Sequence, residues 1–410
     1  MDSALIPEGV KRCSFKAFSL WLLVIFAVLG WGVLGGFLVL WKGLNVTGLN
    51  DSFGFGLYIT ADLAVIALGA GAFFTGFLTY VIGKKELKDI INLAVVVGFI
   101  CYTGAQAVLL LEIGQPIRGW FSFWHPNVHS MLTEVIFCIT CYTIVLTVEY
   151  IPLILENRQL DKVPEFHYFS HNLHEIMVVF AATGTFLSFF HQGSLGGLYG
   201  VMFARPFAFR GGFFIWPWTF FLFVASAIAS GPALTILVCK MVQGVTRKQL
   251  VRREAISLLA KVTGYLLTFY LIFKFLDTWW WATHTAPRMG MSFAEFFQRP
   301  YGLWLLVAEL GVCGVLPAII LLIPKAREDD VLLIVACVLN CSGIVINRFV
   351  FTVQNLALPV LPFEELQIYI PTWQEWAPTV GVLAYGALLL TLSYRYLPKF
   401  PRDRELNPLD

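Results

Sequence analysis

The sequence predicts an all-α integral membrane protein with about ten transmembrane helices. Of its 410 residues, 58% are hydrophobic and only 13% are charged, whereas soluble domains carry roughly 25% charged residues. Apolar runs of about 20 residues, the length that spans a bilayer as a helix, recur along the whole chain. This composition excludes a soluble globular protein and a disordered chain, and the net charge of +2 gives no indication of nucleic-acid binding.

The expected helices follow the apolar runs in order. The first run has about 25 residues, too many for the apolar part of a signal peptide, and no A-x-A cleavage site follows it. We therefore expect this run to be retained as the first span. The expected spans lie near Ala17–Trp41, Phe55–Ile82, Lys88–Leu111, Ser130–Leu155, Phe169–Phe190, Phe213–Cys239, Ile256–Trp281, Gly302–Ile323, Val331–Phe351 and Ala377–Leu397.

The basic residues give these spans an orientation. Most Lys and Arg residues fall in loops on one side of a ten-span arrangement, and cytoplasmic loops carry this excess. We expect both termini to be cytoplasmic. The outer side then has the longer loops, near residues 112–129, 190–212, 278–301 and 352–376. They hold Trp, His, Gly and Pro, and we expect them to carry function or to dock a partner.

The cysteine and histidine residues do not predict a metal site. The C-x-x-C of Cys138 and Cys141 lies within an apolar run and has no second pair, whereas iron–sulfur and structural zinc sites need about four ligands. A b-type haem needs two His on facing helices, and His129 and His191 are both expected at outer helix ends. We expect no haem and no cluster in the chain, with a haem-b quinol oxidoreductase as an alternative.

Ionisable residues gather in the outer third of the expected membrane region. A charge at the bilayer centre costs roughly 2.5–3.5 kcal/mol on insertion scales, so such residues are functional candidates. Asp62, Glu112, His129, Glu134 and His191 belong to this outer group. A carboxylate and an imidazole near one membrane face can hydrogen-bond the carbonyls of a quinone and carry its protons. A transporter would instead place such groups near the midplane.

A sparser inner group indicates a proton path from the cytoplasmic side. We expect His171, His174 and Glu175 at the start of the fifth span, where both histidines are close enough to Glu175 to share protons. Glu149 lies near the inner end of the fourth span and Lys261 on the seventh. The alternative is that these side chains only extend to the membrane interface.

The second half of the chain has its own charged residues, which are Lys274, Asp277, Glu309 and Arg348. Lys274 and Asp277 are three positions apart on one expected helix and should neutralise each other. We expect this half to serve structure and partner docking, with a further proton path as the alternative. In the first half, the residues Gly193–Gly197 predict a turn that shapes the rim of the outer site.

Several motifs, in order along the chain, now point to one family. They are Leu110-Leu111-Glu112-Ile113-Gly114-Gln115-Pro116, Asn127-Val128-His129-Ser130-Met131-Leu132-Thr133-Glu134, Glu149-Tyr150-Ile151-Pro152, Phe190-His191-Gln192-Gly193-Ser194-Leu195-Gly196-Gly197-Leu198, Ala308-Glu309-Leu310 with Leu316-Pro317, and Tyr369-Ile370-Pro371-Thr372-Trp373-Gln374-Glu375-Trp376. Together they resemble the NrfD/PsrC family of polysulfide-reductase membrane subunits. The chain is most similar to the long members, which serve menaquinone reductase and hydrogenase complexes, and the resemblance covers spans two to ten.

The resemblance implies two four-helix bundles and two peripheral helices. The expected division of the chain is 1–54 for the N-terminal tail and the peripheral first span, 55–190 for the first, quinone-binding bundle, 191–351 for an outer loop and the second bundle, and 352–410 for an outer loop, span ten and a cytoplasmic tail.

The resemblance also implies a function in a bacterial inner membrane. The chain would be the quinone-reacting subunit of a respiratory oxidoreductase, not an enzyme alone, passing electrons from an outer-face iron–sulfur subunit to menaquinone. Protons would be taken up from the cytoplasm. Further partners would be a larger molybdopterin-oxidoreductase-like or hydrogenase subunit, or a multihaem cytochrome c. Family members themselves carry no haem or cluster.

The same resemblance implies roles for individual residues. The residues expected to handle protons are His129, Glu134, Asp62 and Glu112, and those expected to bind quinone are His129, Tyr58, Arg118, Trp120, His191 and Gln192. Many relatives have Asp where Glu112 stands, and some long members have Asn where His129 stands. Three alternatives stay open: a quinol-oxidising anchor of a reductase, a secondary ion transporter, and a purely structural anchor that tolerates the loss of His129 and Glu134.

Overall fold

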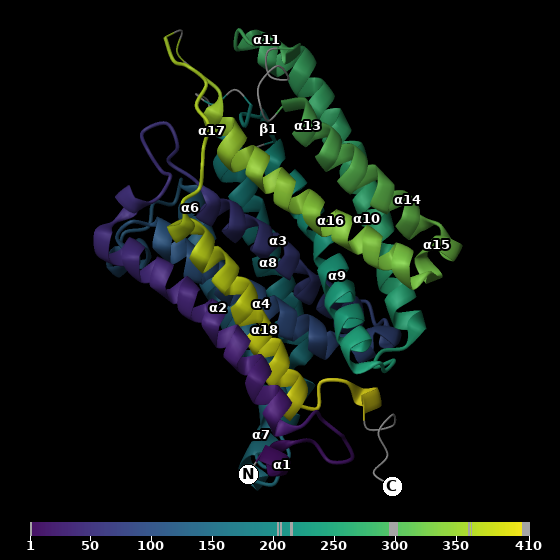
Figure 1. Ribbon diagram of the computed structural model, residues 1–410. Helices are drawn as coiled ribbons and strands as arrows, with labels where there is room; N and C mark the ends of the chain where they lie inside the picture. Colours follow the sequence, from purple (N-terminus) through teal and green to yellow (C-terminus); the bar gives the residue numbers. More distant parts are fainter. Residues whose placement is uncertain are drawn as a thin grey trace.

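A computed structural model describes residues 2–202, 205, 207–213, 216–294, 302–359, 361 and 363–403. Nine helices in these ranges are long and apolar enough to cross a membrane, and a tenth arises if α7 and α8, which are bent by 58°, count as one span. The prediction of an all-α membrane protein with about ten spans is thus confirmed. Both ends of the described chain lie at the bottom of Figure 1. We call that end of the bundle the inner end, and the opposite end the outer end.

The α-helices described in the first half are α1 (Asp2–Leu5), α2 (Phe15–Lys42), α3 (Leu57–Gly76), α4 (Lys88–Glu112), α5 (Phe121–Trp124), α6 (Met131–Leu155), α7 (Pro164–Glu175) and α8 (Met177–Gly200). Those described in the second half are α9 (Trp218–Thr246), α10 (Arg253–Trp280), α11 (Ala286–Arg288), α13 (Gly302–Leu306), α14 (Leu316–Leu322), α15 (Pro324–Glu328), α16 (Asp330–Phe349), α17 (Asn355–Ala357) and α18 (Trp373–Tyr396). A two-residue hairpin, β1 (Gly212–Phe213) with β2 (Trp216–Pro217), precedes α9.

Helix α3 lies at the centre of the molecule. It packs against α4 and α8 of the first half of the chain and against α9 and α16 of the second half, so it joins the two halves. At the crossing with α9, a Cβ added to Gly71 would lie 2.3 Å from the carbonyl oxygen of Gly231. Only residues without a side chain allow helices to approach so closely, and small residues favour such contacts in membranes.

Helices α2 and α18 form a pair that lies side by side along one flank (Figure 1). A Cβ added to Gly35 would lie 2.7 Å from the Cβ of Ala377, so this contact is also close. The pair packs on the first half mainly through α18 and α4. The first and last long helices of the chain are therefore neighbours.

Three expected boundaries around α8 are wrong. The fifth span does not end at Phe190, because α8 continues to Gly200, and the outer loop begins after that residue rather than at residue 191. Residues Gly193–Gly197 form no turn, since they lie inside this helix. The glycines serve packing: a Cβ at Gly196 would lie 2.3 Å from the carbonyl oxygen of Thr219 on α9.

Other helix ends differ in the same way. The fifth span is not one straight helix from Phe169, because α7 ends at Glu175 and the chain bends before α8. Helix α16 continues through a π-helical turn, Val350–Gln354, into α17, so residues 352–357 are helical rather than part of a loop. Two expected segments lie partly outside the described residues. These parts are 295–301 of the expected loop 278–301 and 404–410 of the C-terminal tail.

Candidate functional site

A cluster of polar side chains lies buried among α3, α4, α6 and α8. We call it the first-bundle cluster, and its members are Asp62, Tyr102, Tyr142, Ser188, His191 and Gln192. The hydroxyls of Tyr102 and Ser188 are 2.7 Å apart, and Gln192 Nε2 donates to the carbonyl oxygen of Ile66 at 3.0 Å. The rings of Tyr102 and Tyr142 meet edge to face with centroids 4.5 Å apart.

Several polar atoms of the first-bundle cluster have no hydrogen-bond partner within the described part of the chain. They are Asp62 Oδ1, Tyr142 OH, both ring nitrogens of His191, and Gln192 Oε1. One edge of the His191 ring approaches the backbone of Val135 without a well-aligned hydrogen bond. Unpaired buried polar atoms are rare in native proteins and usually indicate bound water or a ligand. The cluster thus has spare donors and acceptors in an apolar bundle.

Glu134 connects the first-bundle cluster to the outer end. It lies in the first turn of α6 and is half-buried, and its side chain interacts with Ser194 on α8. The next residue, Val135, contacts His191, which is one turn before Ser194 on α8. Glu134 therefore lies about one turn outward of His191.

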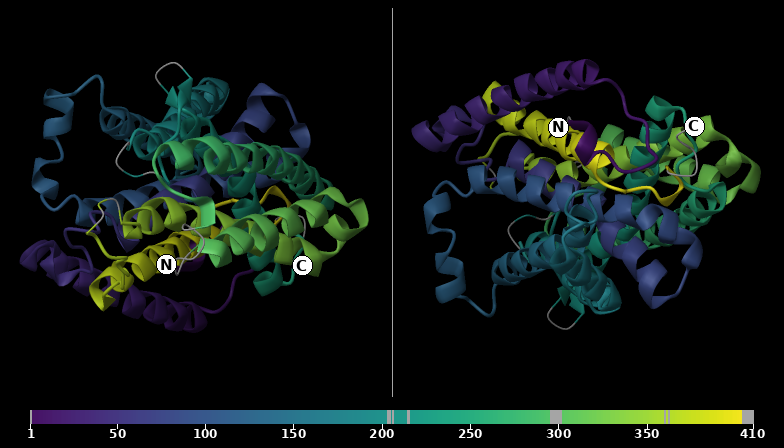
Figure 2. Two further views of the ribbon diagram at one scale, coloured as in Figure 1. Left: turned by 90° about the horizontal axis from the view of Figure 1, so that it is seen from above. Right: turned by 90° about the horizontal axis from the view of Figure 1, so that it is seen from below.

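The remaining expected outer residues lie apart from this cluster. His129, Arg118 and Trp120 are exposed in the segment between α4 and α6, which projects from the helices (Figure 2). The structure therefore does not bring His129 and His191 together as a pair, because one is exposed and the other is fully buried.

Glu112 and Tyr58 take part in contacts that hold the outer end together. Glu112 accepts hydrogen bonds from the backbone N–H groups of Gly56 and Ile59, both at 2.9 Å. These are donors at the start of α3 that no helical carbonyl can satisfy. The hydroxyl of Tyr58 donates to the carbonyl oxygen of Gln374 at 2.7 Å, next to the start of α18.

Sequence reasoning missed a second carboxylate of this kind, Glu375. It accepts hydrogen bonds from the backbone of Gly48 at 2.7 Å and of Thr372 at 2.9 Å, and from the hydroxyl of Tyr369. The spacing Thr372-x-x-Glu375 before an apolar run is the capping-box pattern, which could have been recognised.

The inner residues form a second, smaller group. Glu149 and His174 line one cavity together with Tyr80 and Asn92. About 20 Å³ of it is open to the centre of a water molecule, which is enough for one water. His174 Nε2 lies 2.7 Å from Glu156 rather than pairing with Glu175, so that expectation is wrong.

Three expected inner residues lie outside this cavity. His171 is 3.8 Å from Glu175, and both are exposed on α7. Lys261 lies on the exposed face of α10, in the other half of the molecule.

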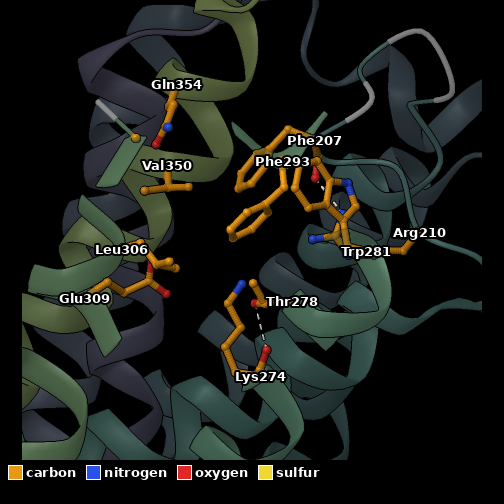
Figure 3. Close-up of a pocket in the computed structure, with 11 residues that line it drawn as sticks. Phe207, Arg210, Lys274, Thr278, Trp281, Phe293, Leu306, Glu309, Val350 and Gln354 are labelled. Carbon is orange, nitrogen blue, oxygen red and sulfur yellow. Dashed lines mark hydrogen bonds between the residues drawn. The ribbon is translucent and has the colours of Figure 1, made fainter. Parts of the chain in front are cut away.

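Two charged residues of the second half, Glu309 and Arg348, are linked through Asn347. Glu309 accepts a hydrogen bond from Asn347 Nδ2 at 2.7 Å, and Arg348 Nη1 donates to Asn347 Oδ1 at 2.7 Å. Lys274 and Glu309 reach into one cavity from opposite sides (Figure 3). The expected neutralisation of Lys274 by Asp277 is wrong, because Asp277 pairs with Arg210 at 2.9 Å. The partner comes from a loop far away in the sequence.

Glu309 lies between two cavities. The cavity in Figure 3 is lined by Lys274 and Arg210, and a second one is lined by Asn340 and Asn347; Glu309 lines both. Each leaves about 20 Å³ for the centre of a water molecule. A π-helical segment, Val307–Val315, carries Glu309, and π-helical turns often occur at functional sites.

No group of three or more His, Cys, Asp or Glu side chains in the described ranges could hold a metal ion.

Comparison with known proteins identifies relatives along nearly the whole chain. A family model described as polysulphide reductase, NrfD, matches residues 45–358. The chain is 57% identical to the menaquinone reductase integral membrane subunit of Nitratidesulfovibrio vulgaris, over 99% of this chain and 98% of the relative. It is 24% identical to a selenate reductase subunit of Mesobacillus selenatarsenatis, over 92% and 93% of the two chains. It is 22% identical to a probable Ni/Fe-hydrogenase 2 b-type cytochrome subunit of Escherichia coli, over 87% and 86%.

Proposed function

The chain belongs to the NrfD family of polysulphide reductase membrane proteins, and on this premise we propose that it is the quinone-reacting membrane subunit of a respiratory oxidoreductase complex in a bacterial inner membrane. It takes electrons from an iron–sulfur partner at the outer face and delivers them to menaquinone. The name of the 57% identical relative, a menaquinone reductase membrane subunit, supports this substrate.

The observation that carries this proposal is the set of unpaired polar atoms in the first-bundle cluster. A carboxyl, an imidazole, a phenol and an amide offer atoms that have no partner among the described residues, close beneath Glu134. A quinone carbonyl needs a hydrogen-bond donor, and its reduction to quinol takes two electrons and two protons. Groups such as His191 and Asp62 can supply both the hydrogen-bond donor and the protons.

The residues of this chain then act in sequence from the outer end. Arg118, Trp120 and His129 form the outer mouth, where an aromatic side chain, an imidazole and the guanidinium of Arg118 suit a ring with carbonyl groups. Glu134 exchanges protons between this mouth and His191. Gln192 and Tyr102 orient the cluster through the carbonyl of Ile66 and the hydroxyl of Ser188.

Protons for this reaction come from the inner end. The cavity of Glu149 and His174 can hold water at the inner end of the same four helices. Electrons that arrive from outside and protons that arrive from inside make the reduction electrogenic.

The partner docks on the outer segment between α4 and α6. Ile117, Trp124 and Val128 are 87%, 71% and 83% exposed there. Large exposed apolar patches on proteins usually mark interaction sites. An iron–sulfur subunit seated there, with a larger molybdopterin-oxidoreductase-like or hydrogenase subunit or a multihaem cytochrome beyond it, would cover these side chains.

A binding titration tests the proposal. A tight quinol-site inhibitor should quench the intrinsic fluorescence of the purified chain saturably. His191→Phe and Glu134→Gln should each weaken binding by roughly tenfold or more, since a lost hydrogen bond in a buried site costs about 1–3 kcal/mol.

Glu165→Gln, on the exposed surface of α7, is the matched control and should leave binding unchanged. Saturable binding that neither cluster substitution affects would remove the first-bundle cluster from the proposal. Steady-state reduction and oxidation of a soluble menaquinone analogue by the complex then separate a quinone reductase from a quinol-oxidising anchor.

A second candidate function is ion transport through the second half. Glu309 lies between two cavities that can each hold a water, opposite Lys274. Proteoliposomes containing this chain alone and a pH-sensitive dye provide the test. Proton flux without a redox partner, abolished by Glu309→Gln, would favour the transporter, and its absence would leave the quinone function alone.

A further inference from the structure

The charged side chains around the cavity of Figure 3 do not balance. Lys274 interacts there with two other cations and with two carboxylates. Four of these five residues are buried and the carboxylate of the fifth, Asp277, is 9% exposed; the five are Arg210, Lys274, Arg348, Glu309 and Asp277. Counted over the described residues, one positive charge is in excess. A buried charge without a counter-charge is costly in an apolar bundle.

Lys274 is the cation that lacks a carboxylate partner. Asp277 pairs with Arg210 at 2.9 Å, and Glu309 accepts a hydrogen bond from a neutral amide. The ammonium group of Lys274 makes no hydrogen bond or ion pair within the described part of the chain, and its ring contact, with Phe351, has Nζ 4.8 Å from the centroid. Figure 3 shows the ammonium group pointing into the cavity.

An unused amide faces the same cavity. Gln354 is 1% exposed, and neither its Nε2 nor its Oε1 has a hydrogen-bond partner in the described ranges. It lines the cavity at the end opposite Lys274 (Figure 3). A buried amide N–H without an acceptor is costly. A charged and a neutral donor are therefore both available to a ligand that can accept hydrogen bonds.

Three π-helical segments meet at this cavity. The segment Trp281–Thr285 supplies Trp281, the segment Val307–Val315 supplies Glu309, and the segment Val350–Gln354 supplies Gln354. Such segments are rare and occur frequently at functional sites. Their convergence indicates a site shaped for a ligand and not a chance gap in packing.

We propose that this cavity binds one small monovalent anion of the size of chloride. About 20 Å³ is open to the centre of a water molecule, which is room for one small ion. The ammonium group of Lys274 and the Nε2 of Gln354 donate to the anion, and hydrogen bonds that involve charged groups are the strong ones.

The bound anion has two effects on the fold. It neutralises the excess positive charge, and it links α10, which carries Lys274, to the segment Val350–Gln354. The site is separate from the first-bundle cluster, so it does not depend on the proposed reduction of quinone.

Thermal unfolding of the full-length chain in detergent tests the proposal. Sodium gluconate, whose anion is too large for the cavity, is replaced stepwise by sodium chloride at constant ionic strength. A ligand that binds only the folded chain stabilises it with the logarithm of its concentration above the dissociation constant. The unfolding temperature should rise by roughly 2 °C for each tenfold increase in chloride. Bromide should act in the same way.

Substitutions of glutamine locate the effect without removing a buried charge. Gln354→Glu places a carboxylate where the anion lies, so it should abolish the chloride dependence and raise the unfolding temperature in gluconate alone. Gln354→Leu removes a donor, so roughly tenfold more chloride should be needed. Gln367→Glu adds the same charge at an exposed position between α17 and α18 and should retain the full chloride dependence.

Three results would overturn the proposal. One is an unfolding temperature of the natural chain that is the same in chloride and in gluconate, as expected if water fills the cavity. Another is a chloride dependence that persists in Gln354→Glu and Gln354→Leu. The third is its loss in Gln367→Glu, which would assign the effect to surface charge.

Discussion

At the scale of single residues, Glu112 joins α4 to the start of α3. Replacing Glu112 by Ala leaves the N–H groups of Gly56 and Ile59 buried without an acceptor, so we expect a loss of stability of about 2 kcal/mol or more. Glu112→Gln keeps one acceptor and should lose less. Thermal unfolding of the purified chain measures this. Lower quinone turnover at an unchanged unfolding temperature would instead indicate a direct role in proton transfer.

Lys399 makes the stability of the C-terminal segment depend on pH. It is 3% exposed just beyond α18, and burial lowers the pKa of its ammonium group to about 7. In the unfolded chain the pKa is about 10.4. Between these values the unfolded state binds more protons, so stability should fall as the pH decreases from about 10 to about 7.

Lys399→Met removes the titrating group and should abolish this part of the pH dependence. Unfolding temperatures across that pH range measure the effect, with Lys84→Met, an exposed lysine, as the control. A difference between Lys399→Met and the natural chain that stays constant with pH would contradict the prediction.

The sequence predicted some candidate residues but not their partners. Asp62 and His191 were identifiable because polar groups in apolar runs are costly, Gln192 followed from the family resemblance, and all three belong to the first-bundle cluster. Tyr102 and Tyr142 were missed, since a tyrosine in an apolar helix is common and gives no signal. Pairs such as Arg210 with Asp277 depend on how distant segments come together, which periodicity along one helix does not encode.

At the scale of elements, α8 depends on its glycines to pack against α9. A Cβ at position 196 would lie 2.3 Å from the backbone oxygen of Thr219, so Gly196→Ala should destabilise the protein by about 1–3 kcal/mol through overpacking. Gly244→Ala in α9, where nothing lies within 4 Å of an added Cβ, is the matched control and should be neutral or stabilising. Equal unfolding temperatures for both variants would show that α8 and α9 can move apart without a loss of stability.

The inner cavity beside α6 offers a second test at this scale. Glu149→Gln keeps the shape of the side chain but cannot carry a proton, so we expect proton uptake from the inner side to slow by roughly tenfold or more. Inhibitor binding at the outer end should not change. The readout is the membrane potential generated by proteoliposomes of the intact complex, with Lys261→Gln on the exposed face of α10 for comparison. An unchanged potential in Glu149→Gln would remove this cavity from the proton path.

Helix ends were harder to predict than helices. The glycines after Phe190 predict a turn when the sequence alone is considered. In the structure they allow close contact with the neighbouring helix α9. The bend between α7 and α8 was also missed. Helix α7 carries polar residues, which the apolar run used to predict the fifth span does not account for.

At the scale of the whole molecule, the exposed outer segment should be the surface where a partner binds. Ile117→Ser and Trp124→Ser should each weaken copurification of the partner subunits by roughly tenfold or more, because a fully buried large apolar side chain contributes about 1.5–3 kcal/mol. Tyr168→Ser, a similarly exposed aromatic at the inner end, is the control. An intact complex in both outer variants would place the interface elsewhere.

The helical class and the number of spans followed from composition. The number of spans was readable because each needs a long apolar run, which few other structures require. The pairing of α2 with α18 could not be predicted, because the sequences of lipid-facing helices are similar wherever those helices pack.

That pairing sets an order for biogenesis. During synthesis α2 leaves the ribosome long before its principal neighbour, α18. In the interval α2 lies in the bilayer with its glycine-lined face towards lipid. The α2–α18 pair therefore closes only after α18 has been synthesised, and a chain truncated before residue 373 would lack the principal neighbour of α2.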